Sequence, residues 1–194
     1  TSLMGAIAVR QALEQAGITD ISGKRVALIS GTTVGGMDLT EKYFERMKTD
    51  DSLLYLPQSN ECGKSTLEIA EIAGLKDIET CTISTACSSA LNSIIIGAEM
   101  LKRDEVDIVI AGGSESLSKF HLNGFNTLMI LDSEPCRPFD DSRAGLNLGE
   151  GAAFVVLEKN AENSLAYVSG YGNRCDAFHQ TASSENGEGA YLAM

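Results

Sequence analysis

Residues 80–113 read TCTISTACSSALNSIIIGAEMLKRDEVDIVIAGG, and this stretch decides the fold. The β-branched run at 80–84 predicts a strand, and 106–111 predicts a buried strand that ends in a pair of glycines. Between them, apolar residues at helical spacing predict a helix with one apolar face. That face consists of Leu91, Ile94, Ile95, Ala98 and Leu101. A strand, a helix and a strand in this order predict a βαβ unit with parallel strands, and hence an α/β fold.

The segments before residue 80 continue the same alternation. A helix is expected over residues 3–16, closed by Gly17, and a strand over 25–30 that ends at Gly31. A glycine-rich loop at 32–36 then leads into a helix near residues 39–48, and a second helix is expected from about 59 to 73. After the βαβ unit, 152–158 and 166–172 predict two further strands. Neither a linker nor a repeat divides residues 1–194, so we expect one globular domain.

Composition and charge exclude several classes of function. The net charge of −12 disfavours a nucleic-acid surface, which needs clustered basic residues, and the sequence lacks the apolar run of about 18–20 residues that a membrane helix requires. Five cysteines without Cys-x-x-Cys spacing indicate neither a disulfide framework nor a zinc ribbon, and fit a reducing compartment such as the cytoplasm. Only two histidines are available, so we expect neither a metal site nor a cofactor.

Cys87 is the candidate reactive residue. It lies between the end of a strand and the start of a helix, where free backbone N–H groups and the helix dipole favour a thiolate. Its neighbours Ala86, Ser88 and Ser89 are small, which allows a sharp turn and close approach of a substrate. Position alone leaves two interpretations open, namely a catalytic cysteine and a buried structural one.

Several motifs occur together in one order. They are Thr85-Ala86-Cys87-Ser88-Ser89-Ala90, Ala111-Gly112-Gly113-Ser114-Glu115, Arg137-Pro138-Phe139-Asp140, Arg143-Ala144-Gly145 and Gly149-Glu150-Gly151-Ala152. In order and spacing the chain resembles the β-ketoacyl synthases of the thiolase superfamily over nearly its whole length. The combination is specific, whereas any single motif would be weak.

The resemblance implies a thiolase-like fold, here its N-terminal three-layer half with a mixed, mostly parallel sheet. It implies that Cys87 takes an acyl group from an acyl carrier protein as a thioester. Decarboxylation of a malonyl thioester then gives a carbanion that attacks this acyl group. The resemblance also implies a homodimer formed around the strand at 80–84. Phe125 is a candidate contact of the acyl chain, although an aromatic residue in an apolar setting is more often part of the core.

The chain departs from the family pattern in three respects. The family's catalytic histidines and lysine lie in the second half, in His-Gly-Thr and Gly-His type motifs that are absent here. The opening strand is also absent, so 1–194 is expected to be a nucleophile-bearing half. Because the donors that stabilise the enolate are missing, this half is not expected to condense by itself. The arginine that often follows the segment equivalent to 124–125 is missing. A smaller basic face for carrier docking could come from Lys42, Arg46 and Lys48, although a solvated helix face is the simpler interpretation.

Other titratable residues in these motifs are expected to be structural. The family counterparts of Glu115, Asp140, Arg143 and Glu150 hold loops by charge-assisted hydrogen bonds. His121 and His179 are interpreted as ordinary hydrogen-bonding histidines rather than catalytic bases.

Four alternatives remain. A non-catalytic partner subunit that sets chain length would resemble a synthase but replace the cysteine. A structural or interaction-only domain is the second alternative. Gly63-Lys64-Ser65-Thr66 resembles the end of a phosphate-binding loop, but the required glycine five positions earlier is Gln58. A serine hydrolase is disfavoured because the Gly-x-Ser-x-Gly turn is absent.

Overall fold

The computed structural model describes residues 1–179 and 181–194, which form two compact units. The first unit is Thr1–Glu158 and the second is Lys159–Met194. Among the described residues, none of the helices has the length and apolarity needed to cross a bilayer.

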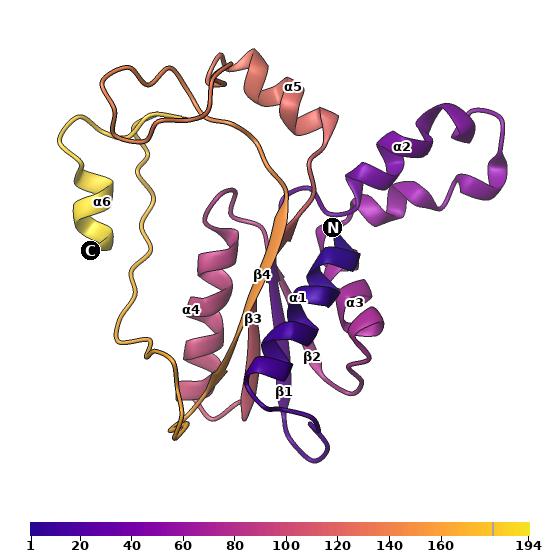
Figure 1. The fold of residues 1–194 in the computed structure, drawn as a ribbon, viewed down its shortest axis with the longest axis vertical. Coiled ribbons are helices and arrows are strands. Elements are labelled where there is room, and N and C mark those ends of the chain that lie inside the picture. The colour runs from indigo at the N-terminus through magenta and orange to yellow at the C-terminus, as the bar shows by residue number, and fades with distance from the viewer. Residues whose placement is uncertain (180) are drawn as a thin grey trace. The chain divides into compact units, whose positions relative to one another are not determined.

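A four-stranded sheet forms the centre of the first unit (Figure 1). Its strands are β1 (Val26–Gly31), β2 (Glu79–Ile83), β3 (Ile108–Glu115) and β4 (Gly151–Glu158), in the order β2-β1-β3-β4. β1 pairs in parallel with β2 and β3, whereas β4 pairs antiparallel with β3. The expected mixed, mostly parallel sheet is therefore confirmed, and β2 is one of its edges.

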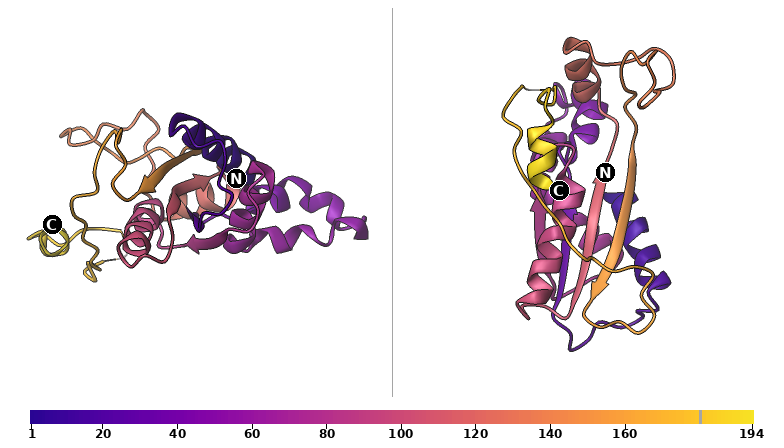
Figure 2. Two further views of the ribbon diagram at one scale, coloured as in Figure 1. Left: turned by 90° about the horizontal axis from the view of Figure 1, so that it is seen from below. Right: turned by 90° about the vertical axis from the view of Figure 1, so that its left-hand side faces the viewer.

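Helices cover both faces of the sheet. α1 (Ser2–Gln15) and α3 (Cys62–Ala73) pack on one face, and α4 (Ser89–Lys102) packs on the other, as the end-on view in Figure 2 shows. The connection β2–α4–β3 is the predicted βαβ unit, with β1 inserted between its two strands. The three-layer α/β architecture is thus confirmed.

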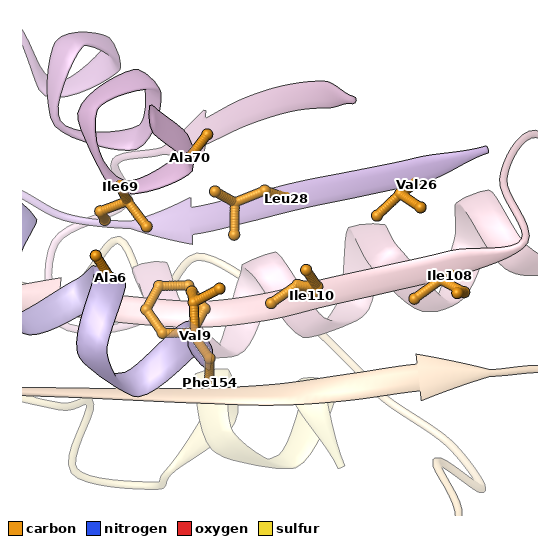
Figure 3. Close-up of a cluster of buried hydrophobic side chains, with 9 residues drawn as sticks. All are labelled: Ala6, Val9, Val26, Leu28, Ile69, Ala70, Ile108, Ile110 and Phe154. Atoms are coloured by element: carbon orange, nitrogen blue, oxygen red, sulfur yellow. The ribbon is translucent and has the colours of Figure 1, made fainter. Parts of the chain in front are cut away.

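Two apolar clusters hold the layers together. Figure 3 shows the cluster under α1 and α3, where Leu28 and Ile110 of the sheet meet Val9 and Ile69 of the helices. On the α4 side, the cluster is centred on Ala27, Ile29, Val109 and other buried side chains. All six residues of β1 are buried, because this strand is covered on both faces and paired along both edges.

The remaining elements lie outside these layers. α2 (Met37–Met47) leads into two short 3-10 helices, η1 (Asp51–Leu53) and η2 (Leu56–Asn60), and every residue of α2 is exposed or half-buried. α5 (Lys119–Thr127) follows β3. The second unit contains α6 (Glu188–Ala193).

Three expectations about elements need correction. The helix predicted from residue 59 begins at Cys62, because Leu56–Asn60 forms the separate 3-10 helix. The buried face of α4 consists of Ser89, Asn92, Ser93, Gly97 and Leu101, whereas Leu91 is 60% exposed. Small residues face the sheet because they let the helix backbone approach it closely.

The strand predicted at residues 166–172 is wrong. Residues 166–172 form irregular backbone within the second unit, and the described residues provide no strand that pairs with them. A β-rich sequence forms a ladder only when a neighbouring strand supplies its hydrogen bonds.

Candidate functional site

Cys87 lies in the tight turn between β2 and α4. β2 ends at Ile83 and α4 begins at Ser89, so the cysteine directly precedes the first turn of the helix. Ala86 has φ +54°, in the left-handed region that favours glycine. Backbone strain of this kind, of the order of 1–2 kcal/mol, often marks functional turns, and it resembles the strained turn that carries a hydrolase nucleophile.

Side chains of the turn and of the helix hold this conformation. Ser89 Oγ accepts a hydrogen bond from Thr85 N at 2.8 Å and donates one to the Ala86 carbonyl at 2.6 Å. Ser88 Oγ donates to the Thr85 carbonyl at 2.8 Å, and Asn92 Nδ2 donates to Thr85 Oγ1 at 2.8 Å. These hydrogen bonds thus tie the polar side chains around Cys87 to the turn that carries it.

Glycines let the start of α4 approach the sheet. A Cβ on Gly31 would lie 2.5 Å from Ala90 N, and one on Gly113 would lie 2.8 Å from Ala90 Cβ. Ser93 Oγ donates to the Gly112 carbonyl at 2.8 Å and fixes the next turn of the helix. The position of Cys87 is therefore set by direct backbone packing against the ends of β1 and β3.

The arrangement suits a nucleophile. Cys87 is exposed, so a thioester could reach its sulfur. Ser88 N and Ser89 N donate to the Thr85 and Ala86 carbonyls at 3.4 and 3.1 Å, so any stabilisation of a negative charge on the sulfur comes from the positive end of the α4 dipole. Because Cys87 is exposed, it is not the buried structural cysteine that sequence alone had left open.

Phe125, the second predicted site residue, lies on another element. It is half-buried on α5. α5 is held at its start by Glu41 of α2, whose two carboxylate oxygens accept hydrogen bonds from Lys119 N and Phe120 N, each at 2.8 Å. The role of Glu41 could not be predicted from the sequence, because a cap supplied by a distant helix leaves no local pattern.

Glu115 has the structural role that the family pattern indicates. Its carboxylate accepts four hydrogen bonds, from Thr32 Oγ1, Thr33 N, Thr33 Oγ1 and Val34 N, at 2.7–2.9 Å. These bonds hold the loop that follows β1 against the end of β3. The carboxylate is fully used as an acceptor and is not available as a catalytic base.

The other motif carboxylates also bind backbone. Asp140 accepts from Ser142 N at 2.7 Å and Ser142 Oγ at 2.6 Å, and hydrogen bonding to this side chain holds the pKa of the Asp140 carboxyl below its ordinary value. Arg143 Nη1 donates to the Asp140 carbonyl at 2.8 Å, and Glu150 accepts from Leu117 N at 3.2 Å. These contacts support the structural interpretation.

The two histidines make local hydrogen bonds. His121 Nδ1 lies 2.9 Å from Ser118 Oγ at the start of α5. In the second unit, His179 Nδ1 accepts from Thr181 N at 3.1 Å and Ala182 N at 3.3 Å. Within the described residues, His, Cys, Asp and Glu side chains form no group of three that could hold a metal ion.

The basic face predicted on α2 is largely neutralised. Arg46 pairs with Asp50 at 3.5 Å, and Lys48 pairs with Glu45 at 2.9 Å. Lys42 lies 5.3 Å from the centre of the Tyr43 ring. These contacts fit a solvated helix face better than a docking surface for an acidic carrier.

A thiolase-like fold is defined by this sheet order together with the cysteine at the β2–α4 turn, and similar solved structures agree. The ishigamide ketosynthase/chain length factor superposes with a TM-score of 0.82 at 29% identity, over 99% of this chain and 51% of that one. A ketosynthase in complex with its chain length factor from Xenorhabdus doucetiae gives 0.81 at 28% identity, over 94% and 47%.

Residues 2–163 match the family described as "Beta-ketoacyl synthase, N-terminal domain", and the chain belongs to this family. Nodulation protein E of Rhizobium meliloti (strain 1021) is 30% identical over 96% of this chain and 49% of its own length. The 3-oxoacyl-[acyl-carrier-protein] synthase 2 of Vibrio cholerae is 32% identical over 95% and 49%. The chain thus spans about half the length of these curated relatives.

Proposed function

We propose that this chain is the nucleophile-bearing N-terminal half of a β-ketoacyl-acyl carrier protein synthase. Such an acyltransferase catalyses the decarboxylative condensation of an acyl thioester with a malonyl thioester. Cys87 at the strained β2–α4 turn is the observation that carries this proposal. Family membership supports it, and so does the likeness to a 3-oxoacyl-[acyl-carrier-protein] synthase.

In the proposed reaction, the Cys87 thiolate attacks the carbonyl carbon of an acyl thioester. The new carbon–sulfur bond to Cys87 replaces the bond to the thiol of the acyl carrier protein, which leaves and takes up a proton. The positive end of the α4 dipole stabilises the charge that develops on the carbonyl oxygen. A malonyl thioester then loses CO₂, and its carbanion attacks the acyl carbon and releases the Cys87 thiolate.

The second stage needs groups beyond residues 1–194. Both histidines of the chain make local hydrogen bonds, and neither resembles a family catalytic position. We therefore propose that these residues alone accept the acyl group and do not complete the condensation. The five unpaired cysteines are consistent with the reducing cytoplasm as the compartment.

The partners proposed are an acyl carrier protein and a second copy of the chain. The edge position of β2 supports a homodimer around that strand, because an unpaired edge is usually covered in the assembled protein.

A partner subunit that sets chain length is the second candidate function. It is favoured by the likeness to two structures described as a ketosynthase with a chain length factor. Retention of Cys87 favours the ketosynthase side of such a pair, since the partner type replaces this cysteine.

Acylation of Cys87 tests the proposal. The chain is incubated with an acyl thioester of an acyl carrier protein, and the protein and its peptides are analysed by mass spectrometry. The expected result is one added acyl group on Cys87, which Cys87→Ser abolishes and the matched variant Cys81→Ser retains. If no adduct forms on Cys87, even when a C-terminal half like that of the relatives is supplied, the proposal is contradicted. The partner-subunit alternative then remains.

A further inference from the structure

A buried amide in the first turns of α4 is bonded to both ends of the Cys87 turn. Asn92 is 6% exposed and belongs to the buried face of α4. Its side-chain nitrogen donates to Thr85 Oγ1 at 2.8 Å and to Ser88 Oγ at 3.3 Å. Thr85 and Ser88 flank the dipeptide Ala86-Cys87 in the sequence. One side chain of the helix therefore holds the residues on both sides of the cysteine.

An amide is costly at this place in the helix. The other buried residues of the first two turns are Ser89 and Ser93, whose small side chains let α4 lie close to the sheet. A buried amide lowers the stability of a fold unless its polar atoms are hydrogen-bonded. The bonds to Thr85 and Ser88 thus identify the part of the molecule on which Asn92 acts, namely the turn before the helix.

Asn92 also fixes the direction of a hydroxyl group. A hydroxyl can rotate and can donate or accept, whereas the NH₂ of an amide only donates. Ser88 Oγ donates toward Thr85, with the Thr85 carbonyl at 2.8 Å and Thr85 Oγ1 at 3.0 Å. Because Asn92 donates to both hydroxyl oxygens, the proton of Ser88 must point away from the amide. The three side chains form a closed triangle of hydrogen bonds between the helix and the turn.

The turn needs such support because its backbone is strained. Ala86 has φ +54°, and a left-handed conformation at a residue other than glycine persists only when its surroundings hold it. If the residues on either side were released, Ala86 could relax toward an ordinary conformation. Cys87 is the next residue, so its sulfur would move with the relaxing backbone.

We propose that Asn92 is a positioning residue for Cys87, whose amide holds the turn in the conformation from which the sulfur reaches an acyl thioester. This inference rests on the acyl transfer proposed above and adds a residue that acts through the turn and not on the thioester. A misplacement of about 1 Å can slow a reaction about a hundred-fold, so loss of these two hydrogen bonds should slow acylation roughly ten-fold.

Asn92→Leu tests the role, because leucine has a similar volume and neither donor. The rate of Cys87 acylation at saturating acyl thioester should fall roughly ten-fold, while the thioester concentration for half-maximal rate stays the same. Asn123→Leu, at an exposed position of α5, is the matched control and should keep the wild-type rate. A wild-type acylation rate in Asn92→Leu, combined with a lower urea midpoint, would leave a structural asparagine and overturn the inference.

A double-mutant cycle with Thr85 isolates the hydrogen bond from other effects of changing Asn92. Thr85→Val keeps the shape and removes the oxygen that accepts from Asn92, whereas Thr85→Ser keeps that oxygen. If the two residues act through one contact, Thr85→Val combined with Asn92→Leu should be no slower than the slower single variant. Thr85→Ser should retain most of the rate. Effects that multiply in the double variant would show that Asn92 does not act through Thr85.

Amide exchange measured by NMR tests the same contact without acyl transfer. Ser88 N donates to the Thr85 carbonyl and Ser89 N to the Ala86 carbonyl, so these two amides report on the closed turn. In Asn92→Leu both should exchange roughly ten-fold faster than in wild type, with a smaller change at Ile110 in β3. An equal change at all three amides, or none, would overturn the inference. Failure of the wild-type chain to be acylated on Cys87 contradicts instead the proposed function.

Discussion

At the scale of single residues, Glu115 at the end of β3 holds the loop that follows β1, beyond the last paired residues of these two strands. Its two oxygens hold Thr32, Thr33 and Val34, so the loop after β1 cannot leave the end of β3 without uncovering a carboxylate. From sequence, the same side chain could be interpreted as a catalytic acid or base. Its hydrogen bonds explain its presence by a structural role alone.

Glu115→Gln should lower the free energy of unfolding by about 1–3 kcal/mol. The amide nitrogen of glutamine cannot accept the bonds that Thr33 N and Thr33 Oγ1 donate to Oε2. Urea unfolding followed by circular dichroism measures the change. Glu14→Gln, at an exposed position of α1, is the matched control and should have little effect. Equal stability of the two variants would contradict the role given to Glu115.

Ser89→Ala should loosen the turn that carries Cys87. The Thr85 N–H loses its acceptor and the Ala86 carbonyl loses a donor, which should cost about 1–2 kcal/mol. Acylation of Cys87 should also slow, because the sulfur is no longer held in one place. The acylation rate and the urea midpoint are measured beside the exposed control Ser183→Ala. An unchanged acylation rate would show that Ser89 does not position Cys87.

At the scale of elements, the close contact between α4 and the sheet depends on glycine residues, which have no side chain. Gly31→Ala places a Cβ 2.5 Å from Ala90 N, so α4 must shift, at a cost of about 1–3 kcal/mol. Gly63→Ala is the matched control, since the open space around Gly63 admits a methyl group. Thermal unfolding compares the two. A Gly31→Ala protein as stable as the control would mean that the helix is not closely docked.

Arg25 and Asp107 join the starts of β1 and β3. Arg25 Nη2 lies 2.7 Å from Asp107 Oδ1, and Arg25 N donates to Asp107 Oδ2 at 2.8 Å. The side-chain hydrogen bond from Arg25, followed by the backbone one, lowers the pKa of Asp107 from 3.8 to about 2. A lowered pKa in the folded state stabilises the fold above the unfolded value, and this contribution is lost as the pH falls.

Asp107→Asn should therefore lower the melting temperature at pH 7 by a small amount, because the pair is partly exposed. The difference from wild type should shrink as the pH falls below 3.8, become small at about pH 2 and disappear below it. Melting curves at pH 7, 3 and 2 test this, with Asp141→Asn as the exposed control. A difference that grows toward pH 2 would refute the assignment.

At the scale of the whole molecule, the proposed dimer predicts that proline has different effects at neighbouring positions of β2. Thr32 N donates to the Ile83 carbonyl, and the N–H and C=O groups of successive strand residues alternate in direction, so Thr80 directs its N–H outward. Thr80→Pro therefore removes a donor at the dimer interface and leaves the ladder with β1 intact. Light scattering should show a monomer that retains its circular dichroism spectrum. Cys81→Pro breaks the inner ladder and should reduce folding itself. A dimer that survives Thr80→Pro would place the interface elsewhere.

Sequence analysis predicted the sheet strands of the first unit and the position of Cys87, because these features depend on local periodicity and on residues adjacent in the chain. It failed at 166–172, where the β-rich pattern lacks a pairing strand in the described part of the chain. It also assigned Leu91 to the buried face, because serine and glycine on the opposite side carry no hydrophobic signal. Contacts between distant elements, such as Glu41 with α5, have no signature in one sequence.

The central position of β1 has a consequence for synthesis on the ribosome. β1 is made before the strands that flank it, and its partner β3 lies about 80 residues later, as the separation of 82 between Arg25 and Asp107 shows. At about 5–20 residues per second, an apolar strand that is buried along its whole length in the finished protein waits roughly 4–16 s for that partner. The nascent chain therefore carries an aggregation hazard that a chaperone at the exit tunnel would have to cover.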